Sequence, residues 1–195
     1  MKYAETIRRL ITGPLLPIAC LAALHSFAVA ASSDGLSVAA ECRNGVPEGK
    51  YQIESAQGRV RVKGSFVDGL RDGEFVFYTA NGDRMIVLPY TRGLLNGAVK
   101  AWHVGAGDAN SPLKLLSDIK DGFIKGRHRT WYENGKPRSD FVIEDGEITA
   151  GETWNPDGTV LEIKDRAQFL SAEIQSDFAY YERLEQVMDA HPPTC

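Results

Sequence analysis

The feature that most constrains this chain is a recurring pair of glycines. The motif Gly-x-x-x-Gly, or a variant with one extra residue, occurs five times, beginning at Gly45, Gly69, Gly93, Gly122 and Gly146. These first glycines lie 24, 24, 29 and 24 residues apart. A nearly fixed period of this length is typical of repeat proteins, in which each repeat is one small unit stacked on the next. The sequence therefore predicts an array of similar units.

Each unit has the pattern of a β-hairpin. In the second unit, Gly73 is followed by a β-rich run at 74–78, the pair Asn81-Gly82 and another β-rich run at 85–88. Asn and Gly accept the positive φ angles that a tight hairpin turn requires. The fourth unit repeats this order around Asn134-Gly135. The sequence therefore predicts a mainly β fold, an elongated antiparallel meander of about five hairpins.

Two further positions of the repeat keep their character. Five residues after the second glycine stand Glu54, Tyr78, Trp102 and Trp131. Three residues before the next unit stand Phe66, Tyr90, Ile119 and Ile143. Together with the glycines and the Asn-Gly turns, these positions resemble the MORN-repeat variant found in many bacterial proteins, over residues 45–164. The resemblance implies a sheet of successive hairpins used mainly for binding and assembly, and it brings no catalytic residues.

The first thirty residues have the features of a signal peptide. Basic residues are followed by an apolar stretch at 15–29, and Ala28-Val29-Ala30 supplies the small residues that a signal peptidase reads. We expect cleavage before Ala31, which places the protein in the periplasm or outside the cell. Two alternatives are an uncleaved anchor, because the stretch from Leu10 to Ala31 is long enough to span a bilayer, and a lipoprotein modified at Cys20.

Charge and cysteine content limit the partners. Without residues 1–30 the chain keeps 19 of its 22 basic and 25 of its 26 acidic residues, a net charge of −6. Such a protein is not expected to bind nucleic acid, or an anionic membrane non-specifically. Two cysteines remain, Cys42 and Cys195, and an even pair in an exported chain predicts a disulfide. Alternatively, Cys195 is a free thiol or pairs between molecules.

The C-terminal segment 165–190 has the pattern of an amphipathic helix. Its apolar residues recur at helical spacing without internal Pro or Gly, and Pro192-Pro193 follow. Ten strands place the two ends of a sheet about 43 Å apart, and a helix of this length covers about 39 Å. We therefore expect the helix to pack along the sheet. The tail 191–195 then brings Cys195 back to Cys42 in the lead-in 31–44.

Alternation along the strands assigns the two faces of the sheet. One face carries Tyr51, Ile53, Phe75, Phe77, Val99, Ala101, His128 and Thr130, and is apolar in the early repeats and polar in the late ones. The opposite face carries aromatic residues beside charges. Its candidate binding residues are Tyr78, Lys100, Trp102, Arg127, Arg129 and Trp131. Aromatic residues on neighbouring strands also stabilise sheets, so a structural role stays open for the three aromatic residues.

Basic residues are concentrated in the late repeats. Within 19 positions the chain has Lys120, Lys125, Arg127, Arg129, Lys136 and Arg138. Such a patch would attract an acidic protein, a phosphate group or an anionic glycan. Charges on hairpin edges also prevent sheets from aggregating, so both interpretations stay open.

The sequence shows no familiar catalytic motif. None of His103, His128 and His191 has a second ligand at zinc spacing, and the phosphate loop, dinucleotide fingerprint and nucleophile elbow are missing. We therefore expect no cofactor and no metal.

Three functions follow in order of preference. The first is a non-enzymatic protein-binding or scaffold module whose partner is another protein of the cell envelope, with an immunity or antitoxin role as a variant. The second is a peripheral binder of lipid or glycan. The third is a hydrolase built from converging carboxylates such as Glu74, Asp83 and Glu133.

Overall fold

The structure is a computed structural model that describes residues 35–104, 111–162 and 166–195. The chain divides into two units, residues 1–32 and 33–195, and all described residues belong to the second. The predicted signal peptide, the cleavage point at Ala31 and Cys20 lie outside the described residues. The elements are β1 (Ser37–Arg43), β2 (Val46–Glu54), β3 (Val60–Val67), β4 (Leu70–Arg71), β5 (Gly73–Tyr78), β6 (Arg84–Thr91), β7 (Leu94–Leu95), β8 (Gly97–Trp102), β9 (Leu113–Lys120), β10 (Phe123–Trp131), β11 (Pro137–Glu144), β12 (Glu147–Thr153) and α2 (Arg166–Ala190).

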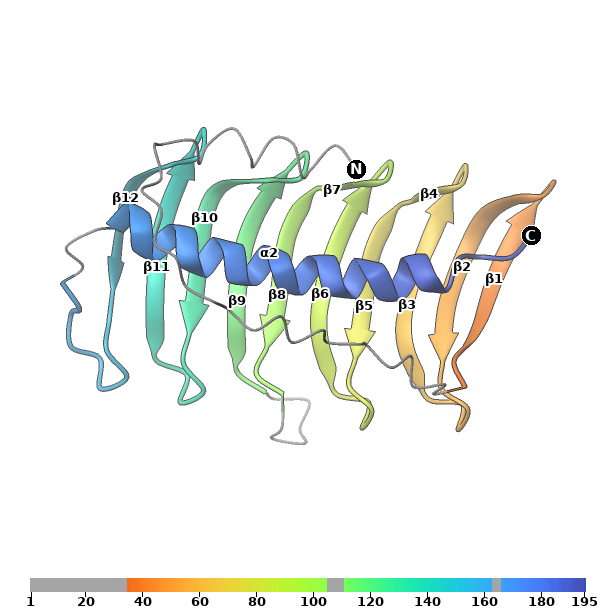
Figure 1. Cartoon of the computed structure of the whole chain (residues 1–195), viewed down its shortest axis with the longest axis horizontal. Helices are drawn as coiled ribbons and strands as arrows, with labels where there is room; N and C mark the ends of the chain where they lie inside the picture. The colour runs from red at the N-terminus through yellow and green to blue at the C-terminus, as the bar shows by residue number, and fades with distance from the viewer. Residues whose placement is uncertain (1–34, 105–110, 163–165) are drawn as a thin grey trace, which may run out of the picture. The chain divides into compact units, whose positions relative to one another are not determined.

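The strands form one antiparallel meander, which confirms the predicted fold. Ten of them lie side by side in the order β1-β2-β3-β5-β6-β8-β9-β10-β11-β12, and the short β4 and β7 pair with β3 and β6 (Figure 1). The sheet begins earlier than the first glycine pair, because β1 lies within the segment 31–44 and pairs with β2. The fifth repeat contributes β12 and only an isolated bridge between Trp154 and Val160.

The repeated glycines have two separate roles. The first glycine of each pair closes a two-residue turn, as at Asp68-Gly69, where both φ angles are positive (51° and 76°). Positive φ at both positions suits the type I′ hairpin turn, which matches the twist of its strands. The second glycine lies opposite the apolar residue that recurs before the next unit. These cross-strand pairs are Gly49 with Phe66, Gly73 with Tyr90, Gly97 with Ile119 and Gly126 with Ile143.

One face of the sheet forms the core. All eight residues predicted for that face are buried, from Tyr51 in β2 to Thr130 in β10. In the early repeats the core is aromatic, and the Phe75 ring lies 5.7 Å from Phe66 and 5.3 Å from Tyr90, both edge to face. Gly64 leaves room for this cluster, since a Cβ there would lie 2.5 Å from the Phe75 ring.

Helix α2 lies along this face and runs from β12 back toward β2 (Figure 1). It begins at Arg166, one residue after the predicted start, and ends at Ala190 as predicted. Tyr181, Leu184 and Met188 are buried against the sheet. Two tyrosines of the sheet donate hydrogen bonds to this segment. Tyr90 Oη donates to Glu185 Oε1 of the helix at 2.6 Å, and Tyr51 Oη donates to the carbonyl oxygen of residue 191, just after the helix, at 2.5 Å.

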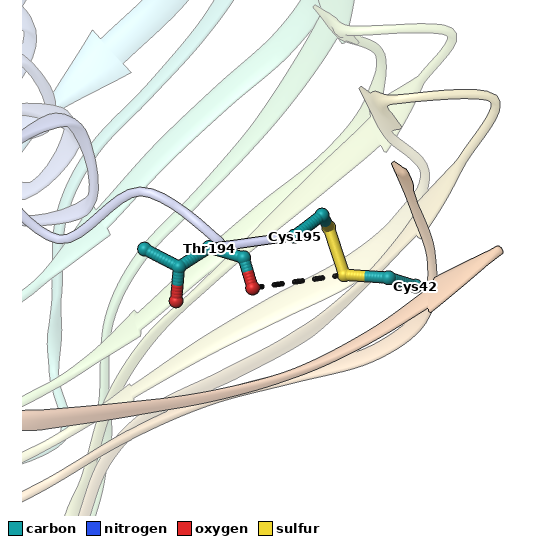
Figure 2. Close-up of a disulfide and its surroundings, with 3 residues drawn as sticks. All are labelled: Cys42, Thr194 and Cys195. Carbon is teal, nitrogen blue, oxygen red and sulfur yellow. Dashed lines mark hydrogen bonds between the residues drawn. A yellow bond between two sulfur atoms is a disulfide. The ribbon is translucent and has the colours of Figure 1, made fainter. Parts of the chain in front are cut away.

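A disulfide joins the tail to the first strand, as predicted. The sulfur atoms of Cys42 and Cys195 lie 1.94 Å apart and their Cα atoms 5.8 Å apart. Figure 2 shows Cys195 at the end of the tail and Cys42 on β1, with the Thr194 carbonyl oxygen 3.8 Å from the Cys42 sulfur. Because a disulfide sulfur carries no proton, that approach is a van der Waals contact. A disulfide of this kind fits a protein of an oxidising, extracytoplasmic compartment.

Candidate functional site

The face opposite α2 is the first candidate site, and we call it the open face. The six predicted binding residues lie there on three strands, β5, β8 and β10. Lys100 and Arg127 are exposed, and the other four are half-buried. The strand register places two of them, Lys100 and Arg129, in one row across the sheet. Successive cross-strand partners in this row are Lys63, Val76, Val87, Lys100, Leu116 and Arg129.

Each predicted aromatic residue has a cation beside its ring. Lys63 Nζ lies 5.4 Å from the centre of the Tyr78 ring, and the Arg84 guanidinium carbon lies 3.9 Å from the centre of the Trp102 ring. The Arg129 guanidinium carbon lies 5.8 Å from the centre of the Trp131 ring. Such contacts contribute about 0.5–1 kcal/mol at exposed sites. The aromatic residues therefore belong to a rigid surface that the sheet itself organises.

Lys63 and Arg84 are the members of this surface that the sequence analysis missed. Regular alternation from Phe75 and Phe77 does not predict the cross-strand partner of Arg84, because the pairing of β5 with β6 shifts register between Phe77 and Tyr78. Tyr78 consequently pairs with Arg84. A bulge of this kind re-aims side chains and is not visible as a change in composition. The sequence signal that could have found Arg84 is its position two residues after the Asn81-Gly82 turn.

Arg129 is the member of the open face with unused hydrogen-bonding capacity. Its Nε is buried and has no hydrogen-bond partner among the described residues. Arg127, two positions earlier, is paired differently, with Nε 3.3 Å from Asp140 Oδ1. A buried donor without an acceptor is unfavourable, so this nitrogen is a cost to the fold and not a contact point for another molecule.

Most of the basic patch is paired within the protein. Lys125 Nζ lies 3.5 Å from Asp145 Oδ1, and Arg138 Nη2 lies 3.0 Å from Glu173 Oε1. The Lys136 ammonium donates to the backbone oxygen of Asp157 at 2.6 Å. Paired charges attract anions less than free ones. The patch is therefore less basic than its sequence indicates.

A second candidate lies beneath the first half of α2, where the core face turns polar. Ser117, His128, Thr130 and Ser139 are buried there, together with Glu173 from the helix, and we call this set the polar cluster. His128 is 0% exposed, with Nδ1 3.1 Å from Ser117 Oγ and Nε2 3.5 Å from Asp177 Oδ2. The Thr130 and Ser139 hydroxyls are 2.6 Å apart.

The helix therefore matches the sheet along its length. Its C-terminal half places Leu184 and Met188 over the aromatic early repeats, and its N-terminal half places Glu173 and Asp177 over the polar late repeats. The sequence analysis predicted the polar end of the sheet from His128 but missed the two carboxylates. Their spacing of four residues, in line with Tyr181, was the signal that could have found them.

Burial shifts the ionisation of this cluster. Burial, with the nearby positive charge of Arg138, lowers the pKa of His128 to about 4, so the imidazole is neutral at physiological pH. Burial raises the pKa of Asp177 to about 7, and the negative charge of Glu173 raises it further. Burial also raises the pKa of Glu173, against the opposing effects of Arg138 and of the Ser139 hydroxyl. Shifts of this kind gather at functional sites, though structural networks produce them too.

The order serine, histidine, aspartate in this cluster resembles a hydrolytic triad in composition only. Ser117 and His128 are both 0% exposed beneath α2. A substrate carbonyl cannot reach the Ser117 hydroxyl in this conformation, and a nucleophile must approach its target within van der Waals distance. The chain of hydrogen-bonding groups therefore supports the docking of the helix.

Next to the polar cluster is an open cleft of about 770 Å³ between the start of α2 and the ends of strands β8 to β11. Its lining includes His103, Lys114, Tyr132, Arg138, Phe169, Glu173 and Asp177. His103 is held in place because its Nε2 donates to the backbone oxygen of Trp131 at 2.8 Å. Clefts of this size accommodate small molecules.

The carboxylates proposed for a hydrolase do not converge. Glu74 is the second residue of β5 and lies opposite Pro89, whereas Asp83 lies in the turn at the other end of the same hairpin. Glu133 lies in the turn between β10 and β11. Within the described ranges no group of three His, Cys, Asp or Glu side chains is arranged to hold a metal ion. Over the same ranges, no helix combines the length and apolarity needed to cross a membrane.

Comparison with known proteins gives no further identification. No protein-family model matches this chain, and no match is found among curated proteins. The resemblance to MORN repeats therefore remains a prediction from the sequence.

Proposed function

We propose that this chain is an exported, non-enzymatic MORN-like repeat protein that binds another protein of the cell envelope through its open face. The observation that carries the proposal is the difference between the two faces. Helix α2 covers one face, and the other carries Tyr78, Trp102 and Trp131, each with a cation beside its ring. Aromatic and arginine side chains contribute most of the binding energy at protein interfaces.

The size of the open face supports a protein partner. Ten strands at about 4.8 Å separation span about 43 Å, and strands of six residues are about 20 Å long. The product is about 860 Å², close to the roughly 800 Å² that each partner contributes to a standard interface.

Export is the second part of the proposal. The signal-peptide pattern and the Cys42–Cys195 pair both support a periplasmic or secreted protein. N-terminal sequencing of the protein recovered from cell fractions tests it. A mature chain that begins at Ala31 in the periplasm or medium is expected, and a cytoplasmic chain that keeps residues 1–30 would contradict it.

The basic patch argues less strongly for a lipid or glycan ligand, because Lys125, Arg127 and Arg138 each have a carboxylate partner within the protein. An immunity or antitoxin role is a special case of protein binding and has no observation of its own in its favour.

Site-specific photo-crosslinking in cells tests the binding proposal. A photoreactive amino acid at Lys100 is expected to capture one envelope protein, and the capture is expected to fall at least tenfold in an Arg129→Ala, Trp131→Ala background. The matched control places the same amino acid at Glu182, an exposed residue on α2. Equal capture from both positions, or no specific capture from Lys100, would contradict the proposal.

A further inference from the structure

The row of side chains that crosses the open face from Lys63 to Arg129 has no acidic member. Between these two residues the successive cross-strand partners are Val76, Val87, Lys100 and Leu116. The next partner after Arg129 is Asp140, whose carboxylate already lies 3.3 Å from Arg127 Nε. On a chain with a net negative charge, this stretch of surface is therefore positive.

The exposed cations of this surface are not neutralised within the protein. Lys63, Arg84 and Lys100 are exposed, and none of them forms an ion pair with another described residue. We call these three residues the cationic strip. Glu74 lies on the same face two positions before Val76, and it forms no ion pair with the strip. The basic patch of the late repeats differs, because most of its charges have partners.

Neighbouring side chains hold the cationic strip in place. Lys63 Nζ lies 5.4 Å from the centre of the Tyr78 ring, and the Arg84 guanidinium lies over the Trp102 ring. Val76 and Val87 are only 7% and 4% exposed although they belong to the open face. Long basic side chains cover apolar neighbours in this way and keep their charged ends in water. Because the cations are already positioned, less conformational freedom is lost when a ligand binds.

We propose that the open face recognises an acidic segment of its protein partner, whose carboxylates lie against the cationic strip. This inference rests on the proposed function and adds the chemistry of the partner. A guanidinium group suits a carboxylate, because its planar donors can meet both oxygens.

The spacing of the charges favours a peptide segment. Lys63 and Lys100 are three strand separations apart, about 14 Å, with apolar and aromatic side chains between them. A phosphate group needs several donors around one point, whereas a segment that mixes acidic and apolar residues matches charges spread along a row. The five strand separations from Lys63 to Arg129 span about 24 Å, which about seven extended residues would cross.

Fluorescence polarisation with a labelled peptide tests the inference. The probe is Glu-Leu-Glu-Ser-Glu-Leu-Glu-Ser with a neutral dye at its N-terminus and an amide at its C-terminus. The same peptide with glutamine in place of every glutamate is the ligand control. We expect the probe to bind with a Kd below about 100 µM in about 50 mM salt. In about 500 mM salt its affinity should fall at least tenfold, because exposed charges are screened.

Charge-reversal variants locate the site. Lys100→Glu should weaken probe binding at least tenfold. Arg183→Glu makes the same change of net charge at an exposed residue of α2, on the other side of the sheet, and should leave the affinity within twofold of the wild type. Lys63→Glu replaces the first variant if circular dichroism shows that Lys100→Glu is unfolded.

Several results would overturn the inference. They are absence of probe binding up to about 1 mM, equal binding of the glutamine peptide, and equal loss of affinity in the Lys100 and Arg183 variants. Tighter binding of a sulfated oligosaccharide of similar length would also overturn it and would identify a glycan site instead.

Photo-crosslinking from Lys100 separates this failure from failure of the proposed function. If one envelope protein is captured there but the acidic probe does not bind, only the acidic-segment inference is wrong. If neither is observed, the proposed function fails with it.

Discussion

Removal of the Cys42–Cys195 disulfide is the perturbation whose effect the structure defines best. The two residues are 153 positions apart, so the bond closes almost the whole described unit into one loop. In the unfolded chain this cross-link restricts the distance between two ends that would otherwise move independently. The substitution Cys195→Ser removes the restriction and leaves the side-chain contacts of α2 with the sheet unchanged.

The magnitude follows from the entropy of loop closure. For a loop of this length the chain-entropy relation gives about 5 kcal/mol at 25 °C, a large share of the 5–15 kcal/mol that stabilises a typical domain. The native fold should nevertheless persist without the bond. Tyr90 still donates to Glu185, and Tyr181, Leu184 and Met188 remain buried against the sheet.

Urea unfolding followed by tryptophan fluorescence and far-ultraviolet circular dichroism measures the effect. With a denaturant slope of about 2 kcal/mol per molar, the midpoint should fall by about 2.5 M. The double variant Cys42→Ser, Cys195→Ser is the control and should match the single variant, because either change opens the same loop. A midpoint shift below about 0.5 M would refute the reasoning, since it would mean that the bond does not constrain the unfolded chain.

Three further perturbations test the packing and the ionisation of the core. Gly64→Ala should destabilise the protein by about 1–3 kcal/mol by overpacking, because the new methyl group would meet the Phe75 ring; in a Phe75→Leu background the same change should cost less. Tyr90→Phe should cost about 0.5–1.5 kcal/mol in urea unfolding, because it removes the hydrogen bond to Glu185, a partly exposed carboxylate that keeps Arg71 beside it. Asp177→Asn should change the pH dependence of stability. Folding raises the pKa of Asp177 from 3.8 to about 7, so between these pH values the folded state binds a proton that the unfolded state does not. The wild type therefore loses stability as pH rises through that range. His128, whose pKa folding lowers from 6.5 to about 4, acts in the opposite direction over nearly the same range. The variant loses the Asp177 effect and keeps that of His128, so its stability should rise relative to that of the wild type from pH 4 to 6.5, by up to about 1.4 kcal/mol per pH unit; a parallel pH profile for both proteins would contradict the assignment.

The sequence predicted the architecture because its signals are periodic. Glycine pairs specify turns, alternation specifies faces, and helical spacing specifies the segment that became Arg166–Ala190. The pairing of Cys42 with Cys195 followed from the even number of cysteines in an exported chain, and the span of ten strands compared with the rise of a helix showed that the tail could return. Such features depend on local backbone geometry, which a sequence expresses directly.

The side-chain sites were harder to predict because they depend on register and on packing between distant segments. A one-residue shift of the ladder brings Arg84 over Trp102, and no composition rule reports such a shift. The polar cluster joins His128 to Asp177 across 49 positions of sequence, through the docking of α2. Neither residue looks unusual alone, and burial beneath α2 is the main cause of the pKa shift of each.

Because α2 returns along the whole sheet, the length of the helix and the number of hairpins must match. Each added hairpin would widen the sheet by about 9.6 Å, and a helix needs six or seven residues to rise by that distance. Insertion of a hairpin alone would leave Cys195 short of Cys42, and deletion would carry it past. Either change would move Glu173 and Asp177 off the polar repeats. Repeat number in this protein can therefore change only together with helix length, unlike in open arrays, where units are added at the end without consequence for the others.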